Sequence, residues 1–180
     1  MKNQDFYTIY SQHVKAPSKE DVIADKKRVF DNLNGRQKKF IHALDRILMS
    51  YKFDSVNLIY LDYGCNDGMF TYAVAKHFNI RAENVWAVDI LEETPYIIKN
   101  AGFNYVRLDL SDVSGSLAKL PKCNFVTIIN VTHHIPIDDR EGLLKLLDHH
   151  ISSKSPIVIK EHECKSTICI YDVIARKFKE

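Results

Sequence analysis

The 180-residue sequence has no long apolar run and no apolar leader segment, and each absence excludes a class of protein. No run approaches the roughly 18 apolar residues that a membrane-spanning helix needs, so we expect no transmembrane segment. The N-terminal segment is polar and lacks an apolar core, so we expect no secretory signal peptide. Internal repeats and low-complexity segments are absent as well. The length therefore predicts one globular domain with a single sizeable core.

Cysteine is scarce and the net charge is small. None of the four cysteines, Cys65, Cys123, Cys164 and Cys169, belongs to a CxxC pair, so we expect reduced thiols in a reducing, cytoplasmic compartment. A formal net charge of +2 argues neither for nor against nucleic acid as a partner of the whole chain. Hydrophobic residues make up 46% of the chain and charged residues 27%, which are ordinary globular values, so the function must be sought in local motifs.

The sequence is organised around one strand–turn–helix stretch. A short apolar run, Val56–Leu61, leads to Asp62 and then to a turn that carries Gly64 and Gly68. An apolar pattern with helical spacing follows to about residue 78. A buried strand that enters a helix through a glycine-bearing turn is half of a βαβ unit, and such a turn holds a ligand where no side chain obstructs the backbone. The stretch therefore predicts a ligand site at the end of this strand.

The residues of this turn carry a resemblance to a known family. The string Asp62-x-Gly64-x-Asn66-x-Gly68 resembles motif I of the class I S-adenosylmethionine (SAM) methyltransferases, usually D/E-x-G-x-G-x-G, with Asn66 in place of the second glycine. Asparagine tolerates the left-handed conformation better than other non-glycine residues. The resemblance implies a Rossmann-like α/β fold, SAM as the cofactor and methyl transfer as the activity. It places the following residues around the cofactor: Asp62, Gly64, Cys65, Asn66, Gly68 and Phe70.

A second buried strand, Asn84–Asp89, ends in an acid 21 residues after Gly68. In α/β sheets that bind adenosine ligands, a carboxylate at this place accepts hydrogen bonds from both ribose hydroxyls. The alternative is a strand-end aspartate that caps the next helix. The glycine turn at the right distance favours the ribose role for Asp89, with Ile90 beside the nucleoside.

Two further strands, Tyr105–Asp109 and Phe125–Val131, are predicted to end at the same site. Ligands lie at the carboxyl ends of strands in open α/β sheets, so both ends should face the cofactor. The resemblance places the adenine at the end of the third strand and the methyl group near the end of the fourth. The cofactor residues that these ends add are Asp109, Leu110, Asn130 and Val131.

The turn after the fourth strand and the end of a fifth strand, Pro156–Glu161, supply candidates that face the methyl acceptor. The turn is similar to the family's motif IV region, where many members carry a histidine, and Ile159–Glu163 is similar to an I-K/R-E-H-D pattern of some members, virus-encoded ones among them. Methyl transfer from a sulfonium mainly needs positioning and exclusion of water, although a hydroxyl acceptor also needs a base. The predicted catalytic residues are His133, His134, Glu161 and His162. The alternative is that these histidines pack and bind loop backbone.

Five strands that alternate with helices predict a doubly wound, mostly parallel sheet with right-handed crossovers. We divide the chain into an N-terminal helical extension, residues 1–52, and a SAM-binding core, residues 53–180, within one compact unit. Family members usually add a sixth and a seventh strand, so we expect either a C-terminal truncation or a naturally short protein. In both cases the fifth strand is an exposed edge through which a homodimer can form.

Metal and NAD are less favoured ligands than SAM. His149 and His150 are predicted at the far end of the sheet from His133, and the spacing of the histidines matches no closed zinc site, so no metal is predicted. The glycines do not fit the G-x-G-x-x-G pattern of dinucleotide sites. Asp62 and Asp67 in the same turn would also repel a pyrophosphate, which argues against NAD.

RNA is a partner that the sequence leaves open. The N-terminal helical region, about 19–51, has a basic polar side, which is usually a solvated face but also suits RNA. RNA 2′-O-methyltransferases use a spaced Lys-Asp-Lys-Glu tetrad, which is not visible here because Lys160 and Glu161 are adjacent. The sequence thus predicts a SAM-dependent methyltransferase with an unidentified N or O acceptor. The alternatives are a viral-type RNA cap methyltransferase and a non-catalytic Rossmann-like interaction module.

Overall fold

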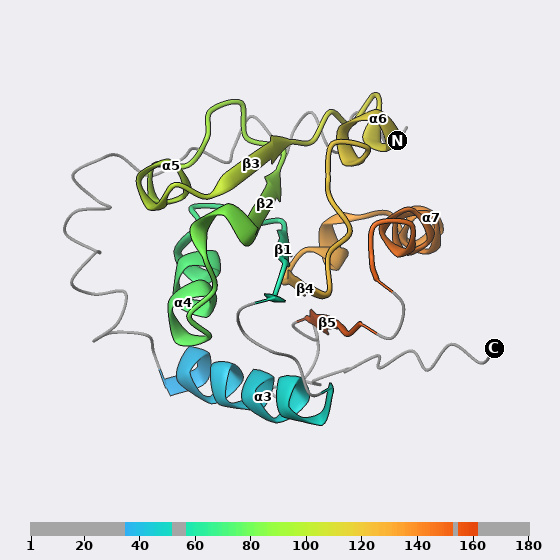
Figure 1. Cartoon of the computed structure of the whole chain (residues 1–180). Helices are drawn as coiled ribbons and strands as arrows, with labels where there is room; N and C mark the ends of the chain where they lie inside the picture. Colours follow the sequence, from blue (N-terminus) through green and yellow to red (C-terminus); the bar gives the residue numbers. More distant parts are fainter. Residues whose placement is uncertain (1–34, 52–56, 153–154, 162–180) are drawn as a thin grey trace.

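A five-stranded parallel sheet forms the centre of the fold in the computed structural model, which describes residues 35–51, 57–152 and 155–161 (Figure 1). The strands lie in the order β3-β2-β1-β4-β5, which confirms the predicted doubly wound α/β architecture. Because the chain reverses its direction of travel across the sheet between β3 and β4, the carboxyl ends of β1 and β4 border the crevice where such sheets bind ligands. The strands are β1 (Tyr60–Tyr63), β2 (Val85–Asp89), β3 (Asn104–Arg107), β4 (Phe125–Ile129) and β5 (Ile157–Lys160).

Helices cover both faces of the sheet, and of the α-helices in the described residues three lie on one side and two on the other (Figure 1). The first face carries α3 (Gly35–Tyr51), α4 (Met69–His77) and α5 (Tyr96–Ala101), and the second carries α6 (Val113–Leu117) and α7 (Ile137–Asp148). Two short 3₁₀ helices, η2 (Ala82–Asn84) and η3 (Thr132–His134), precede β2 and α7. Helix α4 follows the predicted position closely, and Gly102 ends α5 in the left-handed conformation that is typical of a residue at a helix C-terminus.

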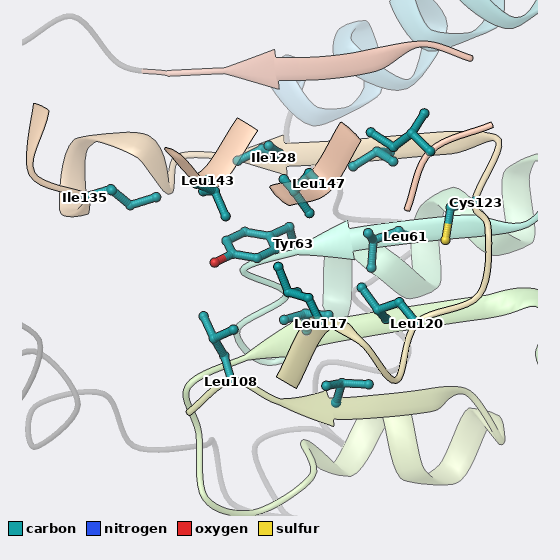
Figure 2. Packing of buried hydrophobic residues seen from close by; sticks show 14 residues of the cluster. Leu61, Tyr63, Leu108, Leu117, Leu120, Cys123, Ile128, Ile135, Leu143 and Leu147 are labelled. Atoms are coloured by element: carbon teal, nitrogen blue, oxygen red, sulfur yellow. The ribbon is translucent and has the colours of Figure 1, made fainter. Parts of the chain in front are cut away.

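The pleat of β1 decides which of its side chains meets which layer of helices. Tyr60 faces α3 and α4 and stacks on Phe125, with 5.1 Å between ring centroids. Leu61 and Tyr63 face α6 and α7, where they pack with Leu147 and its neighbours (Figure 2). Successive side chains of a strand point to opposite faces, so Asp62 shares the side of Tyr60. Because of this alternation, the side chains of Asp62 and Tyr63 lie on opposite faces of the sheet.

The first strand begins later than predicted, and a side chain explains the difference. Asn124 Nδ2 donates to the carbonyl of Asn57 at 2.8 Å, and Asn124 Oδ1 accepts from the N–H of Ile59 at 2.7 Å. An asparagine side chain thus occupies backbone groups that a strand ladder would otherwise use. The regular pairing of β1 starts only at Tyr60, and it continues to Tyr63, two residues beyond the predicted end.

Other predicted strand boundaries were wrong by one or two residues. The fourth strand ends at Ile129 because Asn130 adopts a φ of 55° and leaves the sheet. The short helix α6 begins after Asp112, which caps it by accepting from the N–H of Gly115 at 2.9 Å. Residues 19–34 of the predicted N-terminal helical region, with their part of its basic side, and residues 162–180 of the predicted core lie outside the described residues.

The described part of the predicted N-terminal extension packs directly on the sheet. Phe40, Leu44 and Leu48 of α3 are buried against Tyr60 and Val158. Val158 belongs to β5, which is an edge strand of the described sheet. None of the described helices combines the length and the apolar character that crossing a bilayer requires.

Candidate active site

A cavity of about 840 Å³ opens at the carboxyl ends of the central strands, and α7 forms one wall with residues between Asp138 and Leu146. Its volume lies within the range of roughly 300–1,000 Å³ that small-molecule and cofactor sites occupy. At its floor Tyr63 ends β1, and Figure 2 shows its hydroxyl turned toward the side where Leu108 and Ile135 lie. The predicted residues that line the cavity are Gly64, Asn66, Asp89, Ile90, Leu110, Asn130, Val131, His133 and His134.

The turn after β1 is held by backbone hydrogen bonds and by three left-handed residues. The N–H groups of Gly64 and Cys65 both donate to the carbonyl of Val88 on β2, at 2.8 and 3.0 Å. Gly64, Asn66 and Gly68 have φ values of 81°, 47° and 82°. Asparagine is one of the few non-glycine residues that adopts this conformation at low cost, so Asn66 in the second glycine position preserves the turn.

The two glycines of this turn face protein atoms, which corrects the interpretation that their missing side chains simply clear space for a ligand. A Cβ on Gly64 would lie 2.2 Å from Val131 Cγ2, and a Cβ on Gly68 would lie 2.6 Å from Ile98 Cδ1. Both distances are far below van der Waals contact. The glycines therefore let the turn approach the β4–η3 segment and α5, and this close packing shapes one side of the cavity.

Asp89 fastens this turn to the end of β2. Its Oδ2 accepts from the N–H of Asn66 at 2.7 Å, and its Oδ1 accepts from the N–H of Ile90 at 2.8 Å. Burial raises the pKa of Asp89, although the hydrogen bonds from Asn66 and Ile90 oppose that effect. A carboxylate has about four acceptor positions, and backbone groups of Asn66, Ile90 and Leu91 do not use all of them, so Asp89 can still accept from a ligand. The next helix, α5, begins after Pro95 without a side-chain cap, so Asp89 does not cap it.

Asp62 lies beneath the cavity floor, in a buried polar network that does not line the cavity. Thr71 on α4 donates to Asp62 Oδ2 at 2.6 Å, and Thr127 on β4 donates to Asp62 Oδ1 at 2.7 Å. The Tyr60 hydroxyl completes the network with a 2.7 Å bond to Thr127 Oγ1. Burial raises the pKa of Asp62 to about 6. The carboxyl group therefore joins β1 to α4 and β4 from the face opposite α7.

Replacing Asp62 with asparagine should flatten the pH dependence of stability. Because the pKa of Asp62 is about 6 in the folded protein and 3.8 in the reference state, its contribution to stability is complete below pH 3.8 and is lost as the pH rises through about 6. The difference in pKa corresponds to about 3 kcal/mol. Denaturant unfolding at about pH 4 and pH 8 should show the unsubstituted protein losing this amount relative to Asp62→Asn, and parallel pH curves would contradict the buried carboxyl.

Besides Asp62, four predicted cofactor residues lie outside the cavity lining: Cys65, Gly68, Phe70 and Asp109. Cys65 is buried against Ala87 and Ile98, and burial raises the pKa of its thiol well above the usual value. Phe70 packs against Phe40 on α3, with ring centroids 5.6 Å apart. The Asp109 carboxylate is exposed and accepts from the hydroxyl and the N–H of Ser111 at 2.7 and 2.9 Å, which lowers its pKa. Its neighbour Leu110, by contrast, lines the cavity.

Asn130 presents a polar atom without a protein partner at the end of β4. Its N–H donates to the carbonyl of Lys160 at 2.7 Å, which holds the residue against β5. Its Oδ1 is buried and accepts no hydrogen bond from any residue that the structure describes. A buried acceptor left unsatisfied costs about 1–3 kcal/mol. Since Asn130 also lines the cavity, a ligand that offers an N–H or O–H donor would satisfy it.

Glu161 holds the turn that follows β4 and positions a histidine at the cavity. Its Oε1 accepts from the N–H groups of Val131 and Thr132 at 2.8 and 2.5 Å, and its Oε2 lies 2.6 Å from His133 Nδ1. Burial raises the pKa of Glu161, but hydrogen bonds from His133 and Thr132 outweigh it, so the net pKa is lowered. The carboxylate is therefore ionised at neutral pH. When it binds the protonated Nδ1, the Nε2 of His133 is left as an acceptor.

His134 lies against His133, with ring centroids 3.9 Å apart. Burial and the neighbouring His133 lower the pKa of His134, which favours its neutral form. The fourth predicted catalytic residue, His162, lies outside the described residues. His149 and His150 follow the end of α7. The backbone carbonyl of His150 accepts from the N–H of Cys123, which precedes β4, so both histidines lie at the far end of the sheet as expected. Among the described residues, no group of three or more His, Cys, Asp or Glu side chains is arranged to hold a metal ion.

Several lining residues were missed by the sequence interpretation. Tyr63 could have been found, because it follows Asp62 at a strand end and must point to the opposite face. Leu143 and Leu146 show helical spacing, but that spacing does not reveal which strand ends the helix covers. The other missed lining residues that matter here are Leu108, Ile135, Asp138, Asp139 and Gly142.

Comparisons with known proteins agree with this geometry. A family model described as a methyltransferase domain matches residues 33–169. A solved SAM-dependent methyltransferase from Archaeoglobus fulgidus is 24% identical with a TM-score of 0.52, and the match covers 83% of this chain and 61% of that one. One from Clostridium acetobutylicum is 18% identical with a TM-score of 0.59 and coverage of 80% and 57%. The plantazolicin methyltransferase BpumL, solved with SAH, is 21% identical with a TM-score of 0.54 and coverage of 76% and 53%.

These structural matches establish the fold, and the chain spans less than two thirds of the length of each matched protein. A comparison with curated protein sequences gives no significant match. The virus-encoded subset of the family receives no support from the comparisons.

Proposed function

Because the chain belongs to a family of SAM-dependent methyltransferase domains, we propose that it binds SAM in the cavity at the ends of β1, β2 and β4 and transfers its methyl group to a nitrogen or oxygen acceptor. The observation that carries the proposal is the turn after β1. This turn has the pattern G-x-N-x-G, and Asp89 holds it by a hydrogen bond to the N–H of Asn66. Gly64 and Asn66 of the turn line the same cavity as His133.

The residues present fit the cofactor. Asp89 retains acceptor positions that suit a pair of ribose hydroxyls, and Ile90 and Leu110 offer apolar contacts to a flat base. The unsatisfied Asn130 Oδ1 suits an N–H or O–H donor such as the ammonium group of the cofactor's methionine portion. Bound SAM supplies a methyl group on a sulfonium, which is already a good leaving group.

The chain's own contribution is positioning, exclusion of water and removal of one proton. The apolar walls, Leu143 and Leu146 among them, keep water from the reacting centre. His133 Nε2 accepts the proton that the acceptor loses, and Glu161 positions the imidazole by binding Nδ1. Glu161 does not line the cavity, so we assign it a positioning role in place of the predicted catalytic one.

Calorimetry with SAM tests the proposal, with Asp89→Ala as the decisive variant. We expect the unsubstituted protein to bind SAM and the variant to bind it more than tenfold more weakly, a loss of about 1.4 kcal/mol or more, because both the ribose contacts and the clamp on Asn66 are lost. Glu92→Ala is the matched control, since Glu92 is an exposed carboxylate three residues further along.

An affinity that Asp89→Ala leaves unchanged would remove the ribose role. A thermal shift should accompany binding, because a ligand that binds only the folded state stabilises it. Neither heat nor a thermal shift at millimolar SAM would leave the chain as a non-catalytic module of the same fold.

A further inference from the structure

The charged side chains that line the cavity have one sign, although Arg140 lies just outside the lining, where it donates to the carbonyl of Ile135 at 2.9 Å. Within the part of the chain that the structure describes, the lining carries the carboxylates of Asp89, Asp138 and Asp139 and contains neither lysine nor arginine. A phosphate or carboxylate acceptor would find no cationic partner here and would meet like charge. We propose, building on the methyltransferase function above, that the acceptor is a small apolar amine, cationic at neutral pH, which binds α7 between Asp138 and Gly142.

Gly142 is the residue of α7 that protein packing does not explain. It lies in the interior of the helix and lines the cavity. Glycine there costs about 1 kcal/mol relative to alanine. A Cβ at Gly142 would meet no atom within 4 Å, so no protein neighbour requires the small residue, in contrast to Gly64. The space that it leaves is open toward the cavity and is available to a ligand.

Asp138 and Gly142 lie one helical turn apart and so share a face of α7. Side chains on a helix lean toward its N-terminus, so the space at Gly142 lies beneath the carboxylate of Asp138. We call these two residues the α7 notch. An ammonium group can bind the Asp138 carboxylate at the exposed rim, while the carbon body of the same molecule fills the space at Gly142.

The surroundings of the α7 notch suit an apolar body and a reacting nitrogen. Leu143 and Leu146 of the same helix line the cavity, as does Ile135 immediately before it. The turn that carries His133 leads directly into α7. Methylation of nitrogen requires its lone pair, so a bound ammonium must first release a proton, and His133 offers an acceptor within the same cavity.

Three probes with a phenyl body and different charge test the α7 notch: 3-phenylpropylamine, 3-phenylpropan-1-ol and 3-phenylpropionate. Calorimetry in the presence of S-adenosylhomocysteine (SAH) should show the amine binding about tenfold more tightly than the carboxylate, with the alcohol between them. Asp138→Asn should reduce this preference to about threefold or less. Glu141→Gln is the matched control, because it removes one charge from α7 where Glu141 pairs with Lys145 at 2.8 Å outside the cavity lining.

Gly142→Leu supplies a second variant, and this one should weaken amine binding without destabilising the fold. Leucine is the better helix former, so the unfolding midpoint should stay the same or rise, while amine binding weakens about tenfold because the notch is filled. SAH binding should be retained. Equal affinity for amine and carboxylate, or amine binding that survives both variants, would overturn the amine proposal and leave the methyltransferase function standing.

Two other outcomes also decide the matter. Gly142→Leu that abolishes SAH binding but spares the amine would assign the α7 notch to the cofactor and overturn the proposal. An unsubstituted protein that binds no SAH would overturn the methyltransferase function itself, and the acceptor site with it.

Discussion

Replacing Gly64 with alanine should destabilise the fold by about 2–5 kcal/mol, the sum of two separate costs. The residue has a φ of 81°, a conformation that costs a residue with a Cβ about 1–2 kcal/mol. The new Cβ would also lie 2.2 Å from Val131 Cγ2, and forced overpacking of this kind costs typically about 1–3 kcal/mol. Denaturant unfolding measures the total, and SAM affinity should fall with it because both residues line the cavity.

Gly102→Ala separates the two costs. Gly102 has a φ of 71°, but its Cβ would find only Ala82 Cβ, at 4.0 Å, so this variant reports backbone strain alone. The clash at Gly64 should be partly relieved by Val131→Ala, which removes both γ-methyl groups and leaves only the Cβ at 3.3 Å. The double variant should therefore recover about 1–2 kcal/mol relative to the two single changes added together. Strict additivity would show that a Cβ at position 64 does not clash with the Val131 side chain.

The parallel sheet could be predicted because its signals are local. Each strand is a short apolar run that ends in a polar residue or a turn, and the helices between the strands have apolar faces and recognisable ends. The errors lie where a side chain intervenes in the backbone. Asn124 takes the place of ladder partners before β1, and Asn130 ends β4 by turning into a left-handed conformation. Neither effect follows from propensity, because each depends on an atom that tertiary structure brings close.

The candidate site was predictable at the strand ends and less so elsewhere. Asp89, Asn130 and His133 were found because strand carboxyl ends converge in such sheets. Asp62 was assigned to the cofactor from its place in the motif, although the pleat sends its carboxylate to the face of α4. The contribution of α7 was missed entirely, because the sequence shows that the helix is amphipathic but not that one of its sides lines the cavity at the strand ends. The α7 notch could not be predicted from the sequence, because it depends on the open space next to Gly142 in the folded protein.

Replacing His133 with alanine should lower kcat by about 10²–10⁴ while SAM affinity changes little. The imidazole lines the cavity and is 39% exposed, and the ionised Glu161 holds its Nδ1 at 2.6 Å, so Nε2 is the described base best placed to take a proton from the acceptor. The loss is measured as the rate of methyl transfer to the acceptor at saturating SAM, with the formation of SAH as the signal. His149→Ala is the matched control, since His149 lies past the far end of α7 and outside the cavity lining.

Glu161→Gln distinguishes a positioning role from a merely structural one. The amide keeps the shape and can still accept from the N–H groups of Val131 and Thr132, so the folded turn and SAM binding should persist. It lacks the charge that stabilises the imidazole as it takes up a proton, so kcat should fall by about tenfold to a hundredfold with KM for SAM unchanged. The separate effects on kcat and on KM for SAM therefore distinguish the two roles, because a merely structural contact would change SAM binding or the fold and not kcat alone. If kcat stayed the same in both variants, the proton would have to leave by another route, and the contact between Glu161 and His133 would serve only to hold the turn after β4.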